Sequence, residues 1–80
     1  MIELVLYTRR DCELCREMET VIDEVLPRFQ AQIRRVEIDG DTGLEQRFGV
    51  EVPVLFVNGR KAFKYRCTSR ELRARLAREK

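Results

Sequence analysis

The sequence predicts one α/β domain whose elements follow in the order β-α-β-α-β-β-α. Three observations predict it: short apolar runs bounded by turn residues, segments between them with apolar positions at helical spacing, and an Asn58-Gly59 pair between the last two runs. With 80 residues the chain is near the lower limit for one hydrophobic core, so we expect a single domain over residues 1–80.

The first strand is expected over Ile2–Tyr7, where only Glu3 is polar. A nearly continuous apolar run is typical of a strand buried on both faces, so this strand should be central in the sheet. A helix is expected from about Cys12 to near Pro27. Its apolar residues recur every three or four positions and define one buried face: Leu14, Met18, Val21, Ile22, Val25 and Phe29.

The second strand is expected over Ile33–Ile38, and a strand, helix and strand in this order favour a right-handed parallel crossover. Thr42, with Glu45 three residues later, has the form of a capping box. A short helix is therefore predicted over residues 43–48, with Gly49 following its end.

The third strand, Val54–Val57, leads into Asn58-Gly59. Both central residues of a type I′ turn need positive φ, and Asn-Gly is the pair that adopts it most readily. A returning antiparallel strand is therefore expected over Lys61–Tyr65. A second capping box, Thr68 with Glu71, then predicts a last helix with a narrow apolar stripe at Leu72 and Leu76.

Charge is distributed unevenly along the chain, although the net charge is only +2. The segment from Arg60 onward contains nine Lys or Arg residues and only two acids, Glu71 and Glu79, which gives a local net charge of +7. The first 59 residues have a net charge of −5. This predicts either a solvated helix face or a surface for an acidic partner. No nucleic-acid motif accompanies the charge, so we expect no nucleic-acid partner.

The N-terminal apolar run is too short for a signal peptide or a membrane span. We therefore expect a cytoplasmic protein with no membrane partner. Three cysteines in that reducing compartment, two of them at C-x-x-C spacing, favour redox or metal chemistry over a structural disulfide framework.

The C-x-x-C pair lies where the first strand gives way to the first helix. Unpaired N–H groups and partial positive charge at a helix N-terminus favour thiolate over thiol at Cys12. Cys15 lies about one turn further along the same helix, close enough to attack a mixed disulfide formed at Cys12. Arg9 and Arg10 would add to thiolate stabilisation, whereas Asp11 and Glu13 would oppose it.

A metal site is the alternative for the same residues, with Cys67 as a third ligand. Structural zinc usually takes four ligands, and the chain has no His and no second C-x-x-C. An iron–sulfur cluster shared between subunits would escape that objection. Otherwise Cys67 is expected to be a small, semi-buried residue beside the last helix.

Two segments carry a resemblance to a known family. Leu6–Cys15 and Val52–Gly59 look like the glutaredoxin family of the thioredoxin-fold superfamily, and are most similar to its small bacterial glutaredoxin-like branch. The similarity spans nearly the whole chain. It implies a thioredoxin-like fold with a four-stranded mixed sheet in the order 2-1-3-4, flanked by helices, with the third strand antiparallel to the first.

The resemblance also implies roles for single residues. Cys12 would be the nucleophile, Cys15 the resolving thiol and Pro53 a cis-proline beside them, while the Val52 backbone would offer strand-like hydrogen bonds to a substrate peptide or glutathione. Arg9 matches a position where glutaredoxins carry a lysine that contacts the glutathione carboxylate. A plain surface charge is the alternative for Arg9.

Two departures from the family pattern modify these expectations. Tyr65-Arg66 and Thr68-Ser69 stand where glutaredoxins have a Gly-Gly pair and residues that hold the γ-glutamyl end of glutathione. In the family pattern glutathione approaches the backbone closely at these positions, and here side chains stand in the way, so we expect weak glutathione binding. Glu13-Leu14 replaces the proline-containing pair usual between the cysteines, so the family's reduction potential is not transferred.

The first functional hypothesis is a glutaredoxin-like thiol–disulfide oxidoreductase that reduces protein or glutathione mixed disulfides. It needs no cofactor besides thiols, with glutathione as a weak co-substrate, and we expect a monomer that meets protein disulfides or a reductase. Two alternatives stay open. One is a metal or iron–sulfur binding protein of the same fold, and the other a non-catalytic adaptor that docks its basic C-terminal face onto an acidic partner.

Overall fold

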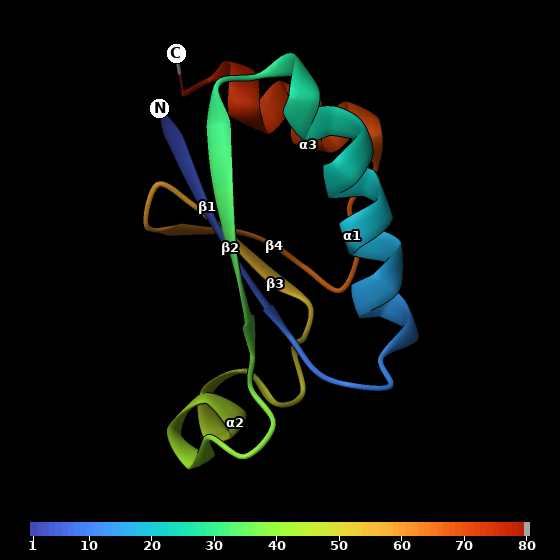
Figure 1. Cartoon of the computed structure of the whole chain (residues 1–80), viewed down its shortest axis with the longest axis vertical. Coiled ribbons are helices and arrows are strands. Elements are labelled where there is room, and N and C mark those ends of the chain that lie inside the picture. The colour runs from blue at the N-terminus through green and yellow to red at the C-terminus, as the bar shows by residue number, and fades with distance from the viewer. Residues whose placement is uncertain (80) are drawn as a thin grey trace.

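The computed structural model describes residues 1–79 and has the predicted order of elements (Figure 1). Lys80, the last of the C-terminal cations, lies outside the described residues. The strands are β1 (Ile2–Thr8), β2 (Ala31–Glu37), β3 (Val54–Val57) and β4 (Arg60–Lys64). The helices are α1 (Glu13–Val25), α2 (Thr42–Phe48), α3 (Ser69–Ala77) and a 3₁₀ turn over Leu26–Arg28.

The four strands form one sheet in the order β2-β1-β3-β4. β1 is parallel to β2, as the crossover through α1 requires, and antiparallel to β3. β3 is in turn antiparallel to β4 across the Asn58-Gly59 turn. The expected sheet order and the central position of β1 are thus confirmed, and the fold is the thioredoxin-like one.

Helices cover both faces of the sheet (Figure 1). On one face α1 and α3 pack against β1 and β3 through the main core, which includes Leu4, Leu6, Met18, Ile22, Leu55, Leu72 and Leu76. On the other face α2 packs through Phe48, whose ring stacks on Tyr7 at 4.4 Å between centroids and meets Phe56 edge-on at 5.9 Å. The aromatic residues of the strands are therefore partly buried and pack against the core.

The hairpin and the last helix form as predicted. Asn58 and Gly59 both have positive φ, at 49° and 81°, which is the requirement of the type I′ turn. The Thr68 hydroxyl accepts from the Glu71 N–H at 3.0 Å, and the Glu71 carboxylate accepts from the Thr68 N–H at 2.9 Å. The capping box at α3 is complete, and Leu72 and Leu76 are fully buried.

Several boundaries differ from the sequence prediction. β2 begins at Ala31 and ends at Glu37, leaving Ile38 outside the strand, and β4 ends at Lys64, leaving Tyr65 outside. At α2 the cap is Asp41, not Thr42: the Asp41 carboxylate accepts from the Leu44 N–H at 3.1 Å. Asp is as good an N-cap as Thr, and its position one residue earlier lets the helix begin at Thr42.

Gly49 follows α2 as expected, but for a steric reason. Its φ is −54°, so it adopts no left-handed conformation. A Cβ at Gly49 would overlap the carbonyl oxygen of Glu45 and lie 3.3 Å from Nη2 of Arg9. The absence of a side chain therefore lets the chain turn closely past the end of α2.

We predict that Gly49→Ala destabilises the protein by about 1–3 kcal/mol, the usual range for overpacking. Gly43→Ala is the matched control, because its Cβ would meet nothing nearer than Oδ1 of Asp41 at 3.6 Å. Alanine at this helical position should be neutral or stabilise by up to about 1 kcal/mol. Urea denaturation of both variants measures the difference, and equal midpoints would contradict the steric account.

Candidate functional site

The Cys12–Cys15 pair follows β1 and lies at the end of the sheet where β1 ends and the chain runs on into α1 (Figure 1). Asp11 turns the chain from strand to helix with φ 52°, a left-handed conformation that Asp tolerates better than most residues. The Arg10 N–H donates to the Asp39 carboxylate at 3.1 Å, which ties this loop to the turn after β2. The loop therefore delivers Cys12 to the N-cap position of α1.

Cys12 and Cys15 form a disulfide, with their Cα atoms 5.2 Å apart. The Cys15 N–H donates to Sγ of Cys12 at 3.2 Å, so the cysteine sulfur occupies the place of a capping side chain. Cys15 is only 3% exposed, whereas Cys12 is partly exposed. The prediction that Cys12 is the more accessible sulfur is confirmed.

The helix N-terminus is the group that contacts the Cys12 sulfur directly. After reduction the Cys15 N–H would still point at Sγ, and a hydrogen bond to a charged acceptor is worth about 1.5–3 kcal/mol. The dipole of α1 acts in the same direction, while Glu13 in the first turn opposes it. This arrangement favours a thiolate at Cys12, the form that attacks disulfides.

The two arginines before Cys12 point elsewhere. Arg10 lies 3.6 Å from the Glu37 carboxylate in an exposed ion pair. Arg9 is partly buried against Gly49, at the C-terminal end of α2, and its Nε is buried without a hydrogen-bond partner among residues 1–79. Neither donates a hydrogen bond to Cys12, so the expected contribution of both to the thiolate is at most a long-range one.

The Val52–Pro53 bond is cis, as expected from the resemblance. Pro53 directly precedes Val54, which pairs with Tyr7 near the end of β1, so Pro53 lies at the same end of the sheet as the disulfide. The Val52 N–H already donates to the Phe48 carbonyl at 3.1 Å. Of its two backbone groups, the Val52 carbonyl is thus the one left for an incoming strand.

Tyr65 borders the same end of the sheet. Its N–H donates to the Pro53 carbonyl at 2.9 Å, and its φ is 70°, a conformation that a bulky residue rarely adopts. The side chain is 41% exposed. Sequence reasoning identified Tyr65 only as a departure from a family pattern and expected it inside a strand; its left-handed backbone had no signal in the sequence.

Cys67 stands apart from the disulfide pair. It is 8% exposed, and burial, with a smaller contribution from the Glu71 carboxylate, raises the pKa of its thiol to about 11. It lines a groove between the middle of α1 and the start of α3, together with Met18. Within residues 1–79 no group of three or more His, Cys, Asp or Glu residues is placed to hold a metal ion.

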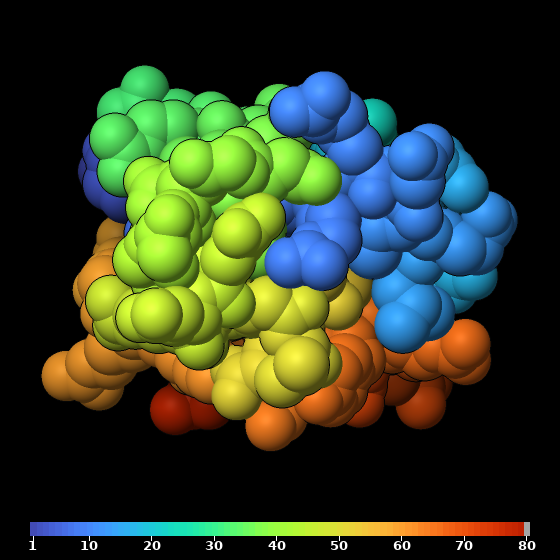
Figure 2. All heavy atoms as spheres, turned by 90° about the horizontal axis from the view of Figure 1, so that it is seen from below, coloured from blue at the N-terminus to red at the C-terminus, as the bar shows by residue number. Residues whose placement is uncertain are grey.

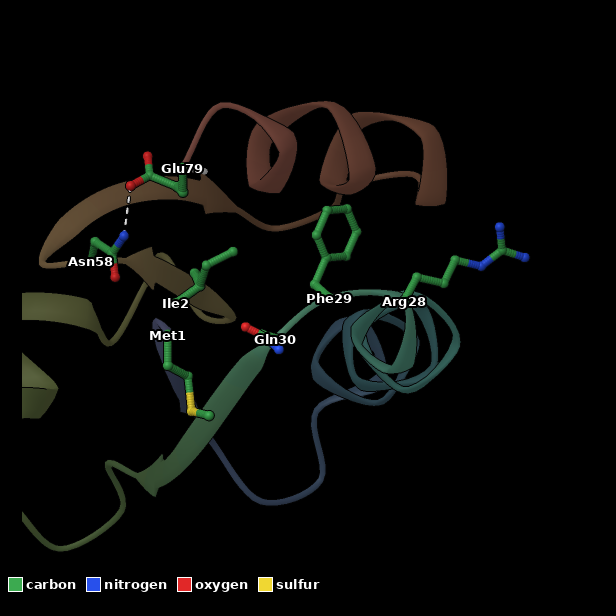
Figure 3. Close-up of a pocket in the computed structure, with 7 residues that line it drawn as sticks. All are labelled: Met1, Ile2, Arg28, Phe29, Gln30, Asn58 and Glu79. Carbon is green, nitrogen blue, oxygen red and sulfur yellow. Dashed lines mark hydrogen bonds between the residues drawn. The ribbon is translucent and has the colours of Figure 1, made fainter.

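Figure 2 shows the face on which these parts meet. The start of α1 (blue) and the segment before α3 (orange) lie on it, with the chain around residues 50–55 (yellow) between them. A second hollow, of about 520 Å³, is lined by residues near the two termini (Figure 3). The termini lie at the other end of the sheet (Figure 1). Its residues include Met1, Arg28 and Glu79, and it contains no cysteine.

Comparison with known protein families supplies the decisive observation. The glutaredoxin-like domain family (DUF836) matches residues 3–77. The chain belongs to this glutaredoxin-like family. Membership confirms the resemblance found in the two sequence segments. No curated protein gives a significant match, and no helix within residues 1–79 has the length and apolar character needed to cross a membrane.

Solved structures of small bacterial proteins are similar over most of their length. Target protein XcR50 from X. campestris is 33% identical with a TM-score of 0.82, and the match covers 94% of this chain and 96% of that one. Protein Ne2328 from Nitrosomonas europaea is 28% identical with a TM-score of 0.77, covering 92% and 89%. Desulfothioredoxin from Desulfovibrio vulgaris Hildenborough is 30% identical with a TM-score of 0.73, covering 96% and 80%.

We predict that alkylation separates the cysteines of this glutaredoxin-like domain. In the reduced protein at pH 7–8, iodoacetamide should modify Cys12 first, because Cys12 is accessible and lies at a helix N-terminus. Cys67 should stay protonated and unmodified until the pH approaches its raised pKa of about 11. Mass spectrometry of tryptic peptides against time and pH measures the order; earlier modification of Cys67 would contradict it.

Proposed function

We propose that this glutaredoxin-like domain is a dithiol thiol–disulfide oxidoreductase. The observation that carries the proposal is the placement of the two sulfurs: Cys12 is partly exposed in the N-cap of α1, and Cys15 is buried within bonding distance of it. One sulfur is thus available to a substrate and the other only to its neighbour. That asymmetry suits a two-step exchange.

In the proposed reaction the Cys12 thiolate attacks one sulfur of a substrate disulfide. A mixed disulfide forms, and the second substrate sulfur leaves as a thiolate that takes a proton from solvent. The Cys15 thiolate then attacks Sγ of Cys12 and displaces the remaining substrate sulfur. The protein loses two electrons and two protons, the substrate gains both, and the product is the Cys12–Cys15 disulfide seen here.

The end of the sheet beside the disulfide supports a peptide-like substrate. The Val52 carbonyl lies just before Pro53, and a proline has no N–H to compete with substrate for a hydrogen-bond acceptor. An extended substrate segment could donate to that carbonyl while its disulfide lies over Cys12. Protein disulfides are therefore the proposed substrates, and a dithiol protein or a reductase the proposed electron donor. We further propose that the domain acts as a cytoplasmic monomer.

Substitution of single cysteines tests the assignment. Cys12→Ser should abolish reduction of bis(2-hydroxyethyl) disulfide, because the attacking thiol is gone. Cys15→Ser should keep exchange with glutathione mixed disulfides and should accumulate unresolved mixed disulfides with protein partners. Cys67→Ser is the matched control and should retain activity. Activity that survives in Cys12→Ser and disappears in Cys67→Ser would refute the proposal.

A second measurement addresses the electron donor. With glutathione and glutathione reductase as the only source of electrons, we expect slow turnover. The Tyr65 side chain stands at the edge of the site, where its left-handed backbone holds it in the way of glutathione. A dithiol donor at the same thiol concentration should support faster turnover. Brisk turnover with glutathione would show that Tyr65 and Arg66 leave room for that tripeptide.

A further inference from the structure

We propose that Tyr65 is the specificity-determining residue of this site and that it selects acidic polypeptide disulfides. The inference rests on the proposed function. Tyr65 combines three properties: its ring is 41% exposed, its backbone is left-handed at φ 70°, and its N–H is bonded to Pro53. Residues held in sparsely populated backbone conformations persist where the surrounding structure fixes them, and they cluster at functional sites.

The position of Tyr65 relative to the disulfide follows from the sheet register. Val54 pairs with Tyr7 on one side and with Lys64 on the other, so the residues before Val54 and after Lys64 lie beyond the same sheet end as Cys12. The groove between α1 and α3 begins beside Tyr65, because the next two residues, Arg66 and Cys67, form one of its walls. Met18 forms the other wall. Met18 lies one helical turn beyond Cys15. Tyr65 therefore stands between Pro53 and this groove.

Fixed backbone geometry keeps the Tyr65 ring at the surface. The hydrogen bond to Pro53 holds the residue at the sheet edge, and the Lys64 ammonium lies 5.4 Å from the ring centroid. An aromatic ring presented in this way offers a flat apolar surface to a passing peptide at little further entropic cost. A small disulfide that reaches only Cys12 would not use it.

The charges around Tyr65 indicate the kind of polypeptide. Lys64 and Arg66 flank it, both exposed, and neither lies within ion-pair distance of a carboxylate among residues 1–79. A longer-range interaction reaches Glu51, whose pKa is lowered by a hydrogen bond from Lys61 and by the attraction of Lys61 and Lys64.

Two acids, Glu17 and Glu71, line the adjoining groove on α1 and α3, whereas the two residues next to Tyr65 in the chain are both cations. Lys64 and Arg66 are thus the charges adjacent to the ring, and carboxylates on a polypeptide segment long enough to extend across the Tyr65 ring would complement them.

Single-turnover kinetics test the proposal without an external reductant. Reduced protein is mixed with excess of a disulfide-linked peptide whose cysteines are flanked by either acidic or basic residues, and acid-quenched samples give the half-saturating concentration and the limiting rate. Bis(2-hydroxyethyl) disulfide serves as the small substrate. The wild-type protein should reach half-saturation at lower concentration with the acidic peptide than with the basic one.

Tyr65→Gly should raise the half-saturating concentration of the acidic peptide about three- to tenfold, the size of one lost aromatic contact. Its limiting rate, and its rate with the small disulfide, should not change. Glycine accepts positive φ without a clash, so the melting temperature should stay at or above that of the wild type. Tyr65→Phe keeps the ring and should behave as the wild type.

A charge variant and its control separate the two parts of the proposal. Arg66→Gln should raise the half-saturating concentration of the acidic peptide about two- to fivefold, as expected for one exposed charge pair. Arg78→Gln makes the same change of charge at the far end of α3 and should have no effect. Equal half-saturation with acidic and basic peptides in the wild type would overturn the preference for acidic substrates.

The remaining outcomes distinguish this inference from the proposed function. A wild-type protein that reduces both kinds of substrate, with peptide half-saturation unchanged in Tyr65→Gly, would overturn the inference alone. A wild-type protein that reduces neither would overturn both. If Tyr65→Gly lowers the melting temperature and slows reduction of the small disulfide as much as reduction of the peptide, the tyrosine has a purely structural role. That result would also overturn the inference.

Discussion

The central position of β1 is the constraint on which the rest of the structure depends. β2 and β3 pair with it on both sides along its length, so its end at Thr8 is fixed in space. Four residues later the chain must enter α1, and the left-handed Asp11 lets it turn within that short distance. Cys12 consequently lands at the helix N-cap, where its sulfur accepts the Cys15 N–H. The redox chemistry proposed for the pair thus follows from where a buried strand ends.

Both borders of the site are attached to the same strand. On one side β3 pairs with β1 and carries Pro53 to its end, and β4 then adds Tyr65 through a hydrogen bond to Pro53. On the other side α1 and α3 pack on the main core, which includes residues of β1, and they hold Arg66, Cys67 and Met18 around one groove. Substrate contacts, if they involve these residues, are therefore set by sheet register and helix packing.

Elements that depend on local chemistry could be predicted from the sequence. The Asn58-Gly59 turn and the Thr68–Glu71 capping box each need only residues a few positions apart, and both form as expected. The cap of α2 was less determinate, because Asp41 and Thr42 are adjacent and both are good cap residues. The C-x-x-C spacing at the start of a predicted helix likewise placed both sulfurs at a helix N-terminus, and it predicted that Cys12 is more exposed than Cys15.

Features that depend on distant contacts could not be predicted in this way. The expected contribution of Arg9 to the Cys12 thiolate did not take into account Gly49, whose missing side chain leaves room for the guanidinium against the end of α2. The hydrogen bond from the Val52 N–H to the Phe48 carbonyl at the end of α2 also had no signal in the sequence. The left-handed backbone of Tyr65 results from the way β4 leaves the sheet beside Pro53, and its residue type gives no indication of it.

Reversible oxidation of Cys12 and Cys15 as one pair is the central claim of this account. Equilibration of the protein in dithiol redox buffers of graded potential, followed by alkylation and mass spectrometry, tests it most directly. The account predicts one transition in which both cysteines lose their thiols together, with the two-electron slope of about 30 mV per tenfold change in ratio, while Cys67 stays reduced throughout. Independent oxidation of the two cysteines, or a disulfide that includes Cys67, would contradict it.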